Sequence, residues 1–169
     1  MTADEERRHV EGGPRRGERT DELVVVVAAR AGDPNLVLQN AREVMLAVLD
    51  HPGPPWPSRD GWRRLLPPWF VDRCAPEMST DEAAEWLAQW RSLAPAERAQ
   101  AERNRSWSLA DWLYWLEPEH REWFWWDAFV ANGTVSITVR VSGWPAPLGA
   151  LDWLLRATGA TEITVHPMP

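Results

Sequence analysis

The sequence predicts an α+β fold, with an antiparallel sheet of about four strands in the βαββαβ order of a ferredoxin-like plait. Two observations support this prediction. A run of valines precedes an amphipathic helical pattern near the start of the chain, and an Asn132-Gly133 pair separates two apolar runs near its end. Short helical patterns fill the region between them. We interpret this region, residues 56–117, as a helical insertion between the first helix and the second strand.

The chain begins with a segment that has no apolar run. Residues 1–20 mix charged residues with Gly and Pro, so we expect a disordered arm followed by a single domain over 21–169. Leu23–Val27 is typical of a strand, and its valines would point to both faces, which indicates a central position. Asp33 and Pro34 then supply the N-cap and the first residue of a helix.

Within the insertion, Pro67-Pro68 separates two short helical patterns. Ser79 and Glu82 form a capping-box pattern before a helix, and Ser108 caps another. Residues 95–105 are polar on all sides, which predicts a solvated helix or connector.

The C-terminal third carries the clearest pattern. The Asn132-Gly133 turn predicts a hairpin with Ala128 opposite Ile137 and Trp126 opposite Val139 on its buried face. A competing interpretation makes residues 118–131 a helix that ends at Asn132-Gly133. A helix after Pro147, ended by Gly159, and a strand over Thr161–Val165 complete the fold.

The same register defines an outer sheet face that would hold the candidate binding residues. These are Trp123, Trp125, Asp127, Phe129, Thr138, Arg140 and, on the last strand, His166. Aromatic side chains on a sheet face are expected to be covered by other protein or by a ligand, and not left exposed to solvent. The insertion, a second copy of the chain, or a ligand or partner in a groove could each supply it.

Composition excludes several classes of function. The net charge of −7 argues against nucleic acid, since a phosphate backbone is held by clustered basic residues. No apolar run is long enough to span a membrane. A single cysteine, Cys74, allows no internal disulfide, and we expect a cytoplasmic protein. All 18 basic residues are Arg, as a GC-rich bacterial genome would produce, and most of the 13 Trp are expected to fill the core.

No pattern of residues predicts catalysis, a metal or a cofactor. The histidines His9, His51, His120 and His166 are scattered, and Glu117-x-x-His120 is only half of a di-iron carboxylate motif. The acids Glu117, Glu119, Glu122 and Asp127 are better explained as a solvated surface than as a glycosidase pair. Sequences for a nucleophile elbow or a phosphate loop are also lacking.

These observations predict a non-enzymatic protein-binding or accessory module, with a protein partner or a homodimer on the outer sheet face. The alternative is a ligand-sensing or enzymatic domain with a pocket between the insertion and that face. The fold alone does not decide between the two.

Overall fold

The computed structural model describes residues 1–168, apart from the side chains of Ala99 and Arg103. It is an α+β structure with one antiparallel sheet in the order β2-β3-β1-β4. The strands are β1 (Leu23–Arg30), β2 (Trp123–Ala131), β3 (Thr134–Val141) and β4 (Thr161–Pro167). The two crossover connections interleave. The chain passes from β1 to β2 with β3 lying between these two strands in the sheet, and from β3 to β4 with β1 lying between them.

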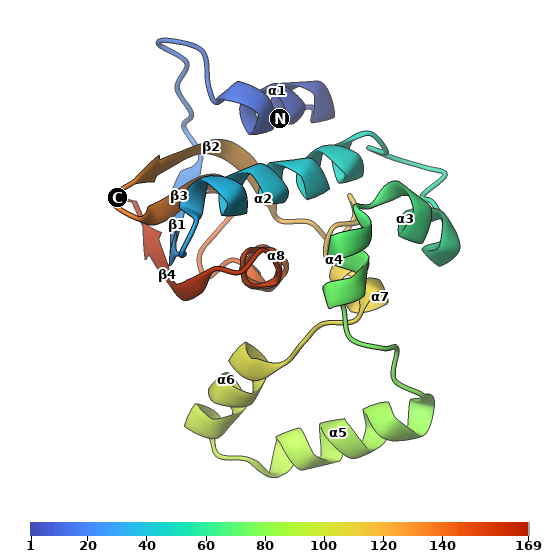
Figure 1. Ribbon diagram of the computed structural model, residues 1–169. Helices are drawn as coiled ribbons and strands as arrows, with labels where there is room; N and C mark the ends of the chain where they lie inside the picture. The colour runs from blue at the N-terminus through green and yellow to red at the C-terminus, as the bar shows by residue number, and fades with distance from the viewer. Residues whose placement is uncertain (169) are drawn as a thin grey trace.

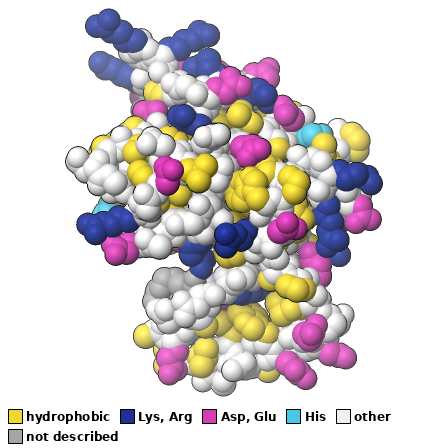
Figure 2. All heavy atoms as spheres, in the orientation of Figure 1, with side chains coloured by type: hydrophobic (Ala, Val, Ile, Leu, Met, Phe, Trp, Pro, Cys, Tyr) yellow, Lys and Arg dark blue, Asp and Glu magenta, His cyan; other side chains and the backbone are white. Residues whose placement is uncertain are grey.

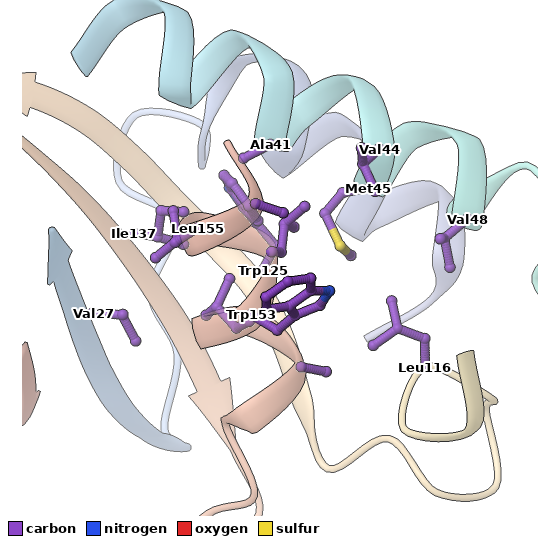
Figure 3. Close-up of a cluster of buried hydrophobic side chains, with 14 of the residues drawn as sticks. Val27, Ala41, Val44, Met45, Val48, Leu116, Trp125, Ile137, Trp153 and Leu155 are labelled. Atoms are coloured by element: carbon purple, nitrogen blue, oxygen red, sulfur yellow. The ribbon is translucent and has the colours of Figure 1, made fainter. Parts of the chain in front are cut away.

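Two helices, α2 (Pro34–Leu49) and α8 (Gly149–Ala157), cover one face of the sheet (Figure 1). The Asp33 side chain accepts a hydrogen bond from the Leu36 N–H at 3.0 Å, as expected for an N-cap. Alternate residues of β1 and β3, such as Val27 and Ile137, point into the layer between sheet and helices (Figure 3). The main core therefore lies on this inner face.

The insertion extends the core beyond the end of α2 instead of covering the sheet (Figure 1). Its helices α3 (Arg59–Leu65), α4 (Pro68–Arg73) and α7 (Leu109–Tyr114) supply buried aromatic residues. Trp112 of α7 packs against Phe70 with ring centroids 4.6 Å apart and donates its indole N–H to Ala150 O of α8 at 3.0 Å. On the opposite, outer face of the sheet, Val24 and Thr138 stay partly exposed.

Two further insertion helices, α5 (Thr80–Ser92) and α6 (Pro95–Asn104), project from the body (Figure 1). We call residues 76–106 the arm. The predicted Ser79–Glu82 capping box is present, and none of the residues of α5 is buried. The arm leaves and rejoins the body at one place, where the Ala75 N–H donates to Trp107 O at 2.9 Å.

The hairpin prediction is confirmed, and the competing helix over 118–131 is wrong. Asn132 and Gly133 both have positive φ, 52° and 75°, as this tight turn requires. Ala128 pairs with Ile137, as predicted. Further along β2, however, the register shifts at a β-bulge between Trp125 and Asp127.

The bulge overturns the predicted position of two candidate site residues. Trp126 is the extra residue, so Trp125 takes its place opposite Val139, and Trp123 lies opposite Val141. A shift of one residue moves every side chain to the other face. Trp123 and Trp125 are consequently 1% and 0% exposed in the inner core, and Phe124 takes the outer face opposite Arg140.

The prediction that residues 1–20 are disordered is also wrong. This segment contains helix α1 (Ala3–Gly12), which packs against α2 and β2. Thr2 and Glu5 form its capping box. Glu6, His9 and Val10 are buried on its inner side, and the His9 ring meets the Trp126 ring edge-on at 4.5 Å. The Glu6 carboxylate accepts the Trp125 backbone N–H at 2.7 Å, so α1 closes the outer edge of β2.

Acid is expected to loosen the attachment of α1. Glu18 accepts from Arg8 at 3.0 Å and from the Arg15 N–H at 2.7 Å, and these bonds lower its pKa from 4.5 to about 2. A lowered folded-state pKa stabilises the fold above pH 4.5, and that stabilisation is lost as the pH falls through 4.5 toward 2. The variant Glu18→Gln lacks this contribution.

Unfolding midpoints of wild type and Glu18→Gln should therefore differ near neutral pH and converge in acid. Glu119→Gln, at an exposed position, is the control. A difference that stays constant down to pH 2 would contradict the role given to Glu18.

Candidate functional site

The outer sheet face brings together five of the seven predicted site residues. Asp127 lies opposite Thr138 and Phe129 opposite Ser136 on β2 and β3, while Phe124 lies opposite Arg140. His166 of β4 joins this face opposite Val26. Phe129 is the most prominent member, with 52% of its surface exposed.

The charged residues of this face already have partners. Arg140 donates to Glu22 at 2.7 Å and lies 5.5 Å from the centre of the Trp126 ring. The Asp127 carboxylate accepts the Ala128 N–H at 2.8 Å, and a Cβ on Gly13 would come within 2.5 Å of its Oδ1 atom. The segment between α1 and β1 thus packs over this corner, and of the five predicted residues on this face, Phe129 and His166 are the exposed ones.

A second surface, which the sequence did not predict, lies between the arm and the body. It consists of two adjoining hollows of about 370 and 290 Å³, both lined by Arg105 and Asp111. We call the two together the aromatic groove. On the body side it is lined by Trp107, Tyr114, Trp115 and Pro147, and on the arm side by Met78, Trp86 and Leu87. Figure 2 shows hydrophobic side chains on the side of the arm that faces the body.

An ion pair divides the groove. Arg105 Nη2 lies 2.7 Å from Asp111 Oδ2, and the Arg105 guanidinium also lies 4.5 Å from the centre of the Trp86 ring, within range of a cation–π interaction. Glu77 and Glu102 line the two ends. Among the described residues, the lining holds three carboxylates and one guanidinium, and Glu77 also lies 4.0 Å from Arg59. The described part of the groove is therefore acidic on balance.

Large apolar side chains in the groove remain exposed to solvent. Tyr114 is 48% exposed, Trp115 38% and Leu87 37%. Helical spacing could have revealed the first two, because they lie off the stripe of α7 and its following turn that faces the core, formed by Leu109, Trp112, Leu113 and Leu116. The groove itself depends on how the arm folds back, which no local pattern encodes.

Other candidates from the sequence have structural surroundings. The half-buried Cys74 thiol donates to Phe70 O at 3.5 Å, and burial raises its pKa to about 11. His120 stacks on Tyr114 at 3.9 Å and lies 3.3 Å from Glu117. Among the described residues, no three His, Cys, Asp or Glu side chains are grouped to hold a metal ion. Nor does any helix within residues 1–168 have the length and apolar character to cross a bilayer.

Comparisons with protein-family models, with curated proteins and with solved structures found no match. The outer face and the aromatic groove are therefore judged by their geometry and chemistry.

Proposed function

We propose that this protein is a non-enzymatic protein-binding module and that its partner occupies the aromatic groove. One observation carries the proposal: Tyr114, Trp115 and Leu87 line a concave surface while each leaves more than a third of its area in water. Exposed aromatic residues in a hollow with a polar rim are typical of interfaces. Burying them against a partner would remove that apolar surface from water.

Charge supports one kind of partner, a polypeptide segment with basic and apolar side chains. Among the described residues of the groove, the carboxylates of Glu77, Glu102 and Asp111 outnumber the guanidinium of Arg105, and they still do when Arg59, 4.0 Å from Glu77, is included. The chain as a whole carries a net charge of −7. Both features favour approach of a cationic segment, and both predict weaker binding as ionic strength rises.

The alternative, a ligand-sensing or enzymatic domain on the outer sheet face, has less support. Its polar candidates Asp127 and Arg140 are engaged by the Ala128 N–H and by Glu22. Phe129 favours a second protein contact on that face, because its ring is half exposed.

We further propose that the sheet with α2 and α8 is a ferredoxin-like plait, extended by α1 and the insertion. The interleaved connections support this assignment, because each βαβ unit is split by a strand of the other. A cytoplasmic location remains part of the proposal and rests on the single cysteine.

Copurification from a lysate of the host, with native mass and identified components, tests the proposed function. Wild type should retain a stoichiometric protein partner. The double variant Tyr114→Ala/Trp115→Ala should lose it, because each aromatic truncation at an interface can cost about 2 kcal/mol or more. Both side chains are exposed, so the variant should fold normally.

Phe129→Ala is the matched control, since it removes an equally exposed aromatic ring from the outer face. Loss of the partner from Phe129→Ala but not from the groove variant would move the interface to the sheet. A wild-type monomer that retains nothing would contradict the protein-binding function and favour the alternative.

A further inference from the structure

A separate cavity of about 190 Å³ lies where four segments of the chain meet. Glu6 comes from α1, Val48 from the end of α2, Trp56 from the loop that follows, and Arg121 from the turn before β2. Figure 3 shows Val48 and Leu116 on facing segments in this region. The cavity is distinct from the aromatic groove and shares none of its lining residues.

One wall of the cavity holds a buried charge pair. The side chains of Arg121 and Glu6 are only 6% and 2% exposed. Arg121 Nη2 donates to Glu6 Oε1, which also accepts the Trp125 N–H. The two charges offset each other, so the pair presents a ligand with little net charge and with the donor of Arg121 that Glu6 does not use.

Arg121 has hydrogen-bonding capacity that the fold leaves unused. Its Nε has no hydrogen-bond partner, but the atom has almost no accessible surface and lies out of reach of a ligand in the cavity. Its Nη1 forms no hydrogen bond to a described residue and is the donor left for a ligand. A buried guanidinium normally has its donors satisfied, because an unpaired buried donor costs about 1–3 kcal/mol. The rings of Trp123 and Phe124, at 4.6 and 5.4 Å from Cζ, fix the guanidinium without satisfying those donors.

The other walls are mainly apolar and aromatic, and His51 and Met1 also line the cavity. Val48, Leu49 and Leu116 are buried, while Trp56 and Phe124 present rings. A cavity of about 150 Å³ is known to hold one benzene ring, so 190 Å³ admits one ring with a small substituent. A guanidinium N–H forms a charge-assisted hydrogen bond with a carboxylate, which is stronger than a hydrogen bond between neutral groups.

We propose that this cavity binds a small organic acid with a single ring or an equally compact apolar body. Its carboxylate accepts from Nη1 of Arg121, and its apolar body lies against Trp56 and Phe124. This site is independent of the protein-binding groove, so either one can fail without the other.

Benzoate and its neutral analogue benzyl alcohol are suitable probes, with dissociation constants measured by ligand-observed NMR on the full chain. Benzoate should bind at least about tenfold more tightly than benzyl alcohol, the difference expected for a charge-assisted hydrogen bond. Arg121→Lys keeps a positive charge beside Glu6 but loses the Nη1 donor. It should remove most of that preference.

A second variant tests occupancy without touching the charge pair. Ala3, at the start of α1, lines the cavity, and Ala3→Phe should fill it and abolish benzoate binding. Asp4→Phe makes the same substitution at the next, exposed position and should bind like wild type. Equal affinity for the two probes, no detectable binding by wild type, or unchanged binding by Ala3→Phe would each overturn the proposal.

Discussion

Replacing Trp125 with alanine should destabilise the protein by about 3–5 kcal/mol, the range for a truncated core tryptophan. Trp125 is 0% exposed and lies on the inner face opposite Val139, beneath α2 and α8. Its removal leaves a cavity that the sheet and helices cannot close. Denaturant unfolding followed by circular dichroism measures the loss directly.

Phe129→Ala is the comparison, because Phe129 lies on the same strand but is 52% exposed. It should change stability by less than about 0.5 kcal/mol. Similar losses of unfolding free energy for the two variants would contradict the position of Trp125 on the inner face of β2.

Glu6→Gln should destabilise the protein by about 3–5 kcal/mol, although α1 contributes only a small part of the core. The change leaves the Arg121 guanidinium, 6% exposed, without its counter-charge. It also weakens the acceptor that covers the Trp125 N–H at the edge of β2. Amide hydrogen exchange at Trp125 should therefore accelerate along with the loss of global stability.

Two comparisons isolate the buried charge. Arg30→Gln breaks the ion pair with Glu162, whose side chains are 71% and 68% exposed, and should cost no more than about 1 kcal/mol. The double variant Glu6→Gln/Arg121→Met should recover part of the loss, because no unpaired charge remains. If Glu6→Gln behaves like Arg30→Gln, the pair does not anchor α1.

Local signals predicted most of the secondary structure. The Asp33 cap, the Ser79–Glu82 capping box and the Asn132-Gly133 turn act over a few residues, and each lies where expected. A capping box at Thr2 and Glu5 was equally visible in the sequence, but the absence of an apolar run in residues 1–20 concealed a helix that buries two charged or polar side chains, Glu6 and His9.

Tertiary context decides what local patterns missed. Both registers of β2 place apolar residues inward, because aromatic residues run from 123 to 126 without a break. The bulge decides between them, and α1 contacts both residues at the bulge. His9 packs on Trp126, and Glu6 accepts the Trp125 N–H. The predicted site is wrong for this reason. Trp123 and Trp125 belong to the core, and the exposed aromatic surface includes Tyr114 and Trp115 instead.

The contact between Glu6 and Trp125 has a consequence for the newly made chain. The two residues are 119 positions apart, so a ribosome adding about 5–20 residues per second needs on the order of ten seconds to travel from one to the other. Throughout that time α1 has neither its strand nor its counter-ion. A nascent chain must therefore keep α1 available, and free of competing contacts, until β2 has been translated.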